Sequence, residues 1–356
     1  MTDILKTCKI DTTMIRKCMV VLAAMLIGTS AQAQENSTNL TPNIHGTVRG
    51  KYEYQPEDKA GRFEVRNARL SVDGKVSEIV EYRAEIDLSN EGKIKMLDAY
   101  TRFKPFDDFQ FTIGQMRVPF TIDAHRSPHK QYFANRSFIA KQVGNVRDVG
   151  ATVGYKTDGA LPIIMEAGIF NGSGVEKQKD FWTKNINFSV KAQFFLPKDF
   201  NLTLSIQKIK PDNAGIIMYD AGAFYHADGW HVEAEYLFKH YDGSAFKNVH
   251  SVNAFVNYDI PLKKCLFSKI SPLLRYDYMN DHSDGMRYLG GKLDKNGSLV
   301  VTDYQRSRLT GGLTLSIDKP FVSDIRINYE KYFYRKGAIP KPSEKDKIVV
   351  ELMTRF

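Results

Sequence analysis

Histidine pairs are the residues of this chain whose type and spacing could bind a metal. His125 and His129 are four residues apart, a spacing that brings two ligands to one face only on a helix, and Pro128 between them disfavours a helix. His231 and His240 are nine residues apart in a strand-like stretch, so their side chains point to opposite faces. These histidines therefore predict no metal site.

Nucleophile and phosphate-loop motifs are also lacking. The stretch Gly172-Ser173-Gly174 does not have the G-x-S-x-G frame of a nucleophile elbow. The sequence contains no glycine-rich loop of the kind that cradles nucleotide phosphates. We therefore expect no enzymatic activity and no cofactor.

A long basic segment over residues 117–147 is the strongest chemical signal. It has no regular hydrophobic period and is longer than ordinary loops, which indicates a functional loop. Asp123 is its only acidic residue. Its basic residues, which are candidates for attracting anions, are Arg117, Arg126, Lys130, Arg136, Lys141 and Arg147.

The elements that must position this loop are strands. Apolar and polar residues alternate through most of the chain, as in Phe188 and Val190 against Asn187 and Ser189, and helical periodicity is almost absent. Each alternating segment is about ten residues long, the length with which a tilted strand crosses a bilayer. We predict about sixteen strands, starting near residues 43, 62, 76, 94, 108, 148, 162, 185, 200, 216, 229, 248, 269, 304, 323 and 346.

The connections between the predicted strands alternate in length. Tight turns are expected at 73–75, 197–199 and 227–229, and longer connections near 55–61, 117–147, 171–183, 241–247, 280–303 and 335–345. The last strand ends in the aromatic residue Phe356. Short turns at one rim and long loops at the other are typical of outer-membrane barrels. The predicted fold is therefore all-β, a transmembrane antiparallel barrel over residues 43–356 with short periplasmic turns and long extracellular loops.

The N-terminus predicts export. Arg16 and Lys17 precede an apolar run over residues 18–28 and an Ala31-Gln32-Ala33 ending, the pattern of a signal peptide. The run is shorter than the roughly 20 residues that span a bilayer, which disfavours the alternative of an N-terminal anchor. We expect a signal peptide over residues 1–33, with Met14 as a possible start, and a short segment over 34–42.

Composition agrees with an exported β-rich protein. The 22 Phe and 18 Tyr argue against disorder, and the net charge of +9 permits anionic partners without identifying one. Loss of residues 1–33 would leave Cys265 as the single cysteine, so no intrachain disulfide is expected.

A barrel of this width has an aqueous lumen, because side chains cannot fill it. On the inward face, basic residues that include Arg49, Arg83 and Arg102 stand against a similar number of carboxylates, with which they can pair. Selectivity must then come from the basic loop, if it folds into the lumen, since a ring of Arg or Lys favours anions. The alternative is a solvated surface loop. Aromatic residues such as Phe133 and Phe138 favour the inward arrangement.

Five ordered motifs carry a family resemblance. They are Arg66-Asn67-Ala68-Arg69-Leu70, Leu97-Asp98-Ala99-Tyr100, Gly114-Gln115-Met116-Arg117-Val118-Pro119-Phe120, Arg147-Asp148-Val149-Gly150 and Gly168-Ile169-Phe170-Asn171-Gly172. Together they resemble the phosphate-selective porin O and P family, and the match extends from about residue 44 to the C-terminus.

This resemblance implies a sixteen-stranded barrel, usually trimeric, whose third long loop constricts the pore and whose basic residues guide phosphate or other anions. Carried over to this chain, Arg117 and Arg147 would flank the constriction loop, with Arg126, Lys130 and Arg136 within it. The tight lysine cluster of characterised members is dispersed here, which reduces the expected phosphate preference to a modest one.

The expected function is therefore passive diffusion of small hydrophilic solutes across a Gram-negative outer membrane, with a modest anion preference. The expected partners are small anions such as phosphate, outer-membrane lipid, two further copies in a homotrimer, and the barrel-assembly machinery through the strand that ends at Phe356. No nucleic-acid partner is expected. The alternative from another class is a non-conducting barrel with a surface binding or structural role. A barrel phospholipase is disfavoured because no Ser–His pair clearly shares an outward face on adjacent strands.

Overall fold

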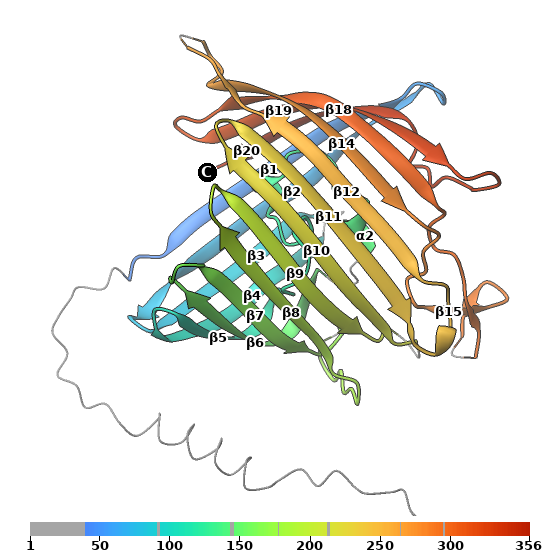
Figure 1. The fold of residues 1–356 in the computed structure, drawn as a ribbon, viewed down its shortest axis with the longest axis horizontal. Helices are drawn as coiled ribbons and strands as arrows, with labels where there is room; N and C mark the ends of the chain where they lie inside the picture. Colours follow the sequence, from blue (N-terminus) through green and yellow to red (C-terminus); the bar gives the residue numbers. More distant parts are fainter. Residues whose placement is uncertain are drawn as a thin grey trace, which may run out of the picture. The chain divides into compact units, whose positions relative to one another are not determined.

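Strand alternation fixes which side chains meet lipid and which line the interior. On β11 (Trp230–Tyr241), Val232 and Tyr236 are 45% and 42% exposed, whereas Glu233 and Glu235 are 1% and 2% exposed. The sheet closes on itself, because β1 (Asn43–Gln55) pairs with β2 (Ala60–Ser77) on one side and with β20 (Lys347–Arg355) on the other. The resulting antiparallel barrel has 16 strands, which confirms the predicted fold class (Figure 1).

The computed structural model describes residues 40–356 apart from 91–92, 143–145, 177, 212–213, 264 and 295. The predicted signal peptide (1–33) and most of the segment 34–42 lie outside the described residues. No helix within the described part is long and apolar enough to cross a membrane.

The remaining barrel strands follow in sequence order. They are β3 (Val80–Asn90), β4 (Lys93–Phe106), β5 (Phe109–Arg117), β6 (Arg147–Thr157), β7 (Ile163–Phe170), β8 (Asn187–Leu196), β9 (Phe200–Ile209), β10 (Ile216–Ala227), β12 (Val249–Tyr258), β14 (Lys269–Met279), β18 (Arg306–Ile317) and β19 (Val322–Tyr334). The short elements are β13 (Ile260–Pro261), β15 (Arg287–Leu289), β16 (Lys292–Leu293), β17 (Ser298–Leu299), η1 (Pro128–Lys130), α2 (Phe138–Gln142) and η2 (Asp242–Ser244).

All sixteen predicted strand starts fall within a few residues of the observed ones. One predicted turn is wrong, because residues 73–75 continue the ladder of β2 with β3 and the turn lies at Glu78–Ile79. Asp73 stays in the strand because its carboxylate accepts a hydrogen bond from Arg83 at 2.8 Å. The predicted long connection at 55–61 is also short, since β1 extends to Gln55 and β2 begins at Ala60.

A register shift between β1 and β2 changes which arginines face inward. Arg49 pairs with Asn67 and Gly50 pairs with Val65, so Arg66 is an extra residue in β2. Beyond such a bulge, the alternation of side chains is inverted relative to a strict two-residue count. Arg69 consequently faces the lumen.

The connection between β5 and β6, residues 118–146, folds inside the barrel. Its apolar residues join a buried cluster with inward-facing residues of β10, β11, β12 and β14, and α2 is enclosed by the strands (Figure 1). Phe138 and Ile139 are both 0% exposed. The inward-folded third long loop is therefore confirmed, and the inner wall on this side is apolar where it meets the loop.

Candidate functional site: a basic constriction

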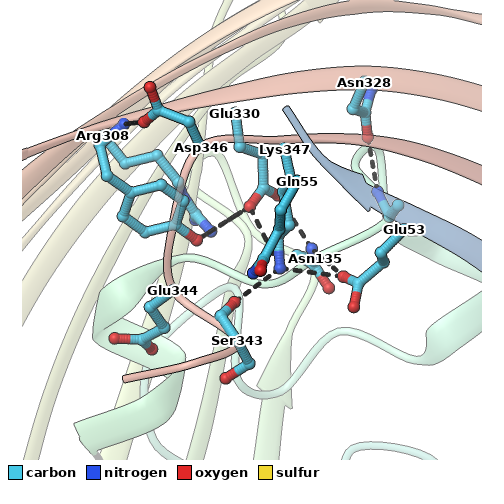
Figure 2. A network of polar contacts seen from close by, with 12 residues as sticks. Glu53, Gln55, Asn135, Arg308, Asn328, Glu330, Ser343, Glu344, Asp346 and Lys347 are labelled. Atoms are coloured by element: carbon cyan, nitrogen blue, oxygen red, sulfur yellow. Dashed lines mark hydrogen bonds and ion pairs between the residues drawn. The ribbon is translucent and has the colours of Figure 1, made fainter. Parts of the chain in front are cut away.

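Hydrogen bonds to the barrel wall fix the second half of the loop that crosses the lumen, which we call L3 (residues 118–146). The Asn135 amide donates to Glu330 on β19 at 3.0 Å. Lys347 on β20 donates to Glu53 on β1 at 2.9 Å and to the Ser343 carbonyl at 2.7 Å. Figure 2 shows these side chains converging from β1, β19, β20 and L3. This part of L3 thus lies against the wall at the seam of the barrel.

Arginines of the wall support the same half of L3. Arg49 donates to the Gln131 side chain at 2.8 Å and to the Ala134 carbonyl at 2.9 Å. Arg275 donates to the Asn135 carbonyl at 2.9 Å, and Arg308 donates to the Arg136 carbonyl at 2.8 Å. These guanidinium groups hold the loop backbone.

The first half of L3 is fixed to the opposite side of the wall. The Thr121 amide donates to Ser205 on β9 at 3.1 Å, and the Thr121 carbonyl accepts from Lys191 on β8 at 2.6 Å. Thr121 has φ of 60°, a left-handed conformation that costs free energy in a β-branched residue and persists because these contacts hold it. The Ile122 amide donates to Glu235 on β11 at 2.5 Å.

Open space remains between L3 and the wall formed by β2–β7, with β1 and β20 at its edge. A cavity of about 410 Å³ lies there, between this wall and the L3 segment around η1. Its lining residues are His45, Thr47, Arg69, Ser71, Arg83, Glu85, Asp98, Tyr100, Arg102, Met116, Arg117, His125, Ser127, Pro128, His129, Lys130, Glu166 and Arg355. We call this cavity the constriction.

The constriction carries more positive than negative charge. Among the described residues, no carboxylate lies within 4.0 Å of Arg117, Lys130 or Arg355. Arg117 instead donates weakly to loop carbonyls, with its Nη1 at 3.4 Å from the carbonyl of His125. Three cations without a carboxylate partner therefore border one cavity.

The other basic residues of the constriction are paired. Arg83 contacts Asp73 at 2.8 Å and Glu85 at 2.7 Å, and Arg69 contacts Glu85 at 3.1 Å. Arg102 lies 4.0 Å from Glu81. These pairs reduce the field of the wall arginines without cancelling that of the three unpaired cations.

The two histidines of L3 add no charge at neutral pH. Burial lowers the pKa of His129 to about 3, and the nearby cations Arg355 and Lys130 lower it further in the same direction. Burial and the positive field also hold the pKa of His125 well below its usual range. Both imidazoles are therefore neutral, polar lining groups.

Of the nine candidate residues that the sequence singled out, four line the constriction. These are Arg83, Arg102, Arg117 and Lys130. The side chain of Lys141 lies outside the described residues.

Arg126 and Arg136 do not line this cavity. Arg126 contacts Glu233 at 2.5 Å and Asp123 at 3.3 Å, and Arg136 donates to the Arg126 carbonyl at 2.7 Å. The carboxylates of Glu233 and Asp123 hold Arg126, and backbone carbonyls of L3 hold Arg136. Their position on the far side of the loop follows from tertiary contacts that spacing does not reveal.

Arg147 and Arg49 are also buried in ion pairs. Arg147 contacts Asp98 at 2.6 Å and Glu85 at 3.2 Å, and Arg49 contacts Glu351 at 2.6 Å. Their guanidinium groups hold the wall and the loop together. Neither borders the constriction.

Sequence reasoning missed two basic residues of the site. A strict two-residue alternation along β2 would place Arg69 on the outer face, but the bulge at Arg66 turns it inward. Arg355 is distant from L3 in sequence, so spacing does not connect it with the site. Only a sequence pattern that marks the bulge in β2 could have predicted that Arg69 faces the lumen.

Comparisons with known proteins agree with this geometry. The family model described as "Phosphate-selective porin O and P" matches residues 39–192. No curated protein sequence matches the chain.

Three solved structures illustrate the similarity in fold. OmpT, an outer-membrane protein of Vibrio cholerae solved in a trimer form, has 11% identity and a TM-score of 0.61, with 89% of this chain and 98% of that chain covered. OprB of Pseudomonas putida has 12% identity and a TM-score of 0.60, with 88% and 93% covered. An anion-selective porin from Comamonas acidovorans has 10% identity and a TM-score of 0.58, with 88% and 98% covered.

These results also agree with the expectation that the protein is a channel and not an enzyme. The chain therefore has the fold of bacterial outer-membrane porins, and its residues 39–192 match the family model of the phosphate-selective porin O and P family.

Proposed function

We propose that this porin passes small hydrophilic solutes by passive diffusion and prefers anions, phosphate among them. The observation that carries the proposal is the set of three cations, Arg117, Lys130 and Arg355, which border the constriction and have no carboxylate partner among the described residues. Unpaired Arg and Lys side chains lining a narrow pore attract anions and repel cations. Guanidinium groups also suit phosphate oxygens, because their donors match that geometry.

The relatives support the same direction. The family that matches residues 39–192 is named for phosphate selectivity, and one similar structure is that of an anion-selective porin. Paired charges on most of the wall limit the preference to a modest one. Phosphate therefore passes as one anion among several.

We further propose that the functional unit is a homotrimer, as in the trimer form of OmpT. The C-terminal strand is a candidate recognition signal for barrel assembly. Phe356 closes the seam against β1, since its backbone amide and carbonyl exchange hydrogen bonds with Gly46 at 3.1 and 2.7 Å. The Phe356 ring covers Gly46, where a Cβ would lie 2.1 Å from the ring.

The test is the reversal potential of the purified porin in planar bilayers across a potassium chloride gradient. Each unit charge within about 4 Å of a permeating ion contributes on the order of 1 kcal/mol in water. The variant R117Q/K130Q/R355Q is therefore expected to lower the anion-to-cation permeability ratio by roughly tenfold or more.

The matched control is K198Q/K263Q/K319Q, which removes three exposed lysines from the periplasmic turns and should leave the ratio unchanged. An unchanged ratio in the constriction variant would contradict the anion preference. A folded barrel without conductance would instead favour the alternative of a surface binding or structural role.

A further inference from the structure

Exposed basic and aromatic residues lie at the long-loop rim of the barrel, around the ends of β8 and β9. The set consists of Trp182, Lys184 and Ile186 in the connection before β8, and of Lys208 and Lys210 at the end of β9. We call it the lysine–tryptophan rim. We propose that this rim binds the phosphate groups of the phosphorylated glycolipid that forms the outer leaflet of the outer membrane.

Lys208 lies where the lipid-facing surface of the barrel ends. It follows Leu204 and Ile206 on the outward face of β9, and it is opposite Phe188 on β8 and Ile217 on β10. A lysine at this level can extend its ammonium group to the interface while its methylene chain stays on apolar surface. The same charge at the centre of the lipid belt would be costly.

Contacts between the loop and the strand hold the lysines together. The Lys210 ammonium donates to the Asn185 side chain at 3.3 Å, and the Lys210 backbone amide donates to the Asn187 side chain at 3.1 Å. Lys184 precedes Asn185 directly, and Lys208 is about 7 Å from Lys210 along the strand. Within the described part of the chain, no carboxylate lies within ion-pair distance of these three lysines.

The apolar members of the rim are uncovered by the rest of the chain. Trp182 is 94% exposed and Ile186 is 64% exposed. Aromatic residues at the barrel rim pack at the boundary between acyl chains and headgroups. Three cations on the same stretch of rim as such a residue match a molecule that carries acyl chains and phosphate in one headgroup.

Charge complementarity favours the lipid over a second copy of the chain. A symmetric contact through this rim would bring three unneutralised lysines against their equivalents, and like charges facing each other disfavour association. A lipid phosphate neutralises them instead. The predicted occupant is therefore the lipid headgroup, and free phosphate in solution is not expected to replace it.

The chain offers a direct spectroscopic test, because it contains only 2 tryptophans. Trp230 begins β11 at the periplasmic rim, so the variant Trp230→Phe leaves Trp182 as the single reporter. This single-tryptophan porin, folded in detergent, is titrated with diphosphorylated lipid A. We expect a saturable blue shift of Trp182 emission.

Substitution K184Q/K208Q/K210Q in the same background is expected to weaken the apparent affinity for lipid A at least tenfold. The matched variant K198Q/K263Q/K319Q, with three lysines removed at the opposite rim, should bind as the parent does. Heat-modifiable migration on a gel verifies that each variant has folded.

Four outcomes would overturn the proposal. Dephosphorylated lipid A could bind equally well, which would reduce the rim to an acyl-chain contact. The triple variant could retain full affinity, or inorganic phosphate alone could produce the same shift. A blue shift without lipid, accompanied by a larger oligomer on a native gel, would assign the rim to a second copy of the chain.

Discussion

Arg49 on the first strand and Glu351 on the last strand form a 2.6 Å ion pair across the seam at which the barrel closes. Glu351 also accepts from Arg326 at 2.7 Å, and Arg49 also donates to Gln131 and Ala134 of L3 at 2.8 and 2.9 Å. The Arg49 and Glu351 side chains are only 2% and 0% exposed. One carboxylate therefore contributes both to closure of the barrel and, through Arg49, to the position of the constriction loop.

The substitution Glu351→Gln tests this double role. It leaves Arg49 and Arg326 buried without their carboxylate, and breaking a buried pair costs about 3–5 kcal/mol. We expect the variant to lose its folded, fast-migrating gel band at a lower temperature than the parent and to show a noisier conductance.

The control for Glu351→Gln is Glu176→Gln, which removes the exposed partner of Lys95 at 3.1 Å. An exposed pair of this kind contributes about 0–1 kcal/mol, so the control should melt as the parent does. Equal melting temperatures for both variants would show that the seam pair is not critical for closure.

Lys130→Gln and Arg126→Gln separate a pore-lining cation from a structural one within the same loop. Lys130 borders the constriction, whereas Arg126 is paired with Glu233 and Asp123. We expect Lys130→Gln to reduce anion selectivity with little effect on stability. Arg126→Gln should destabilise the barrel by several kcal/mol, because buried Glu233 loses its arginine partner and keeps only the contact with His231.

Reversal potentials and thermal unfolding of the two variants check this division. The opposite pattern, with Arg126 controlling selectivity and Lys130 controlling stability, would mean that L3 has the reverse face toward the pore.

The strand positions were predictable because each strand is a local two-residue pattern. Burial of one face makes that pattern strict, as on β11, where every inward residue from His231 to Tyr241 is buried. The position of Arg126 was not predictable, because it depends on Glu233, more than a hundred residues away in sequence. The inward position of Arg69 was not predictable for a local reason, since the one-residue bulge at Arg66 inverts the alternation of side chains along β2.

The resemblance motifs have a physical content that sequence alone did not reveal. Gly114 has φ of 132°, and a Cβ there would lie 2.3 Å from the Ala99 carbonyl oxygen on β4. Only glycine fits this close approach of two strands. The residues after Gly114 lead directly into L3, so the motif marks the point where the wall becomes the constriction loop.

Phe138 is the apolar anchor of L3, and Phe138→Ala should widen the pore. The ring is 0% exposed and lies under Arg306 and Arg308, whose guanidinium carbons are 4.4 and 4.7 Å from its centroid. Truncating a buried Phe to Ala costs about 3–5 kcal/mol, which here loosens the contact between α2 and the wall. We expect a larger single-channel conductance and weaker anion selectivity.

The control for Phe138→Ala is Phe63→Ala, because Phe63 is 86% exposed on the outer face. It should leave the conductance unchanged. A conductance that stays at the parent value in Phe138→Ala would mean that polar contacts alone hold L3 in place.

Asp281 links three long loops in a pH-dependent way. Its carboxylate accepts from Arg335 at 2.9 Å, from Lys247 at 2.8 Å and from the Gln305 amide at 2.7 Å. Burial alone would raise the pKa of Asp281, but the hydrogen bonds from Arg335 and Lys247 outweigh it and lower the pKa to about 2. A carboxyl whose pKa is lower in the folded state stabilises that state above its unfolded pKa of about 3.9.

The stabilisation by Asp281 should therefore be complete at neutral pH and should disappear as the pH falls from about 4 to about 2. Hydrogen exchange in residues 280–305 and 335–346 is expected to accelerate over this range, relative to the same segments in Asp281→Asn. The variant lacks the titrating carboxylate and serves as the reference for the intrinsic pH dependence of exchange. Parallel exchange profiles in the two proteins would mean that other contacts, and not the Asp281 carboxylate, join these loops.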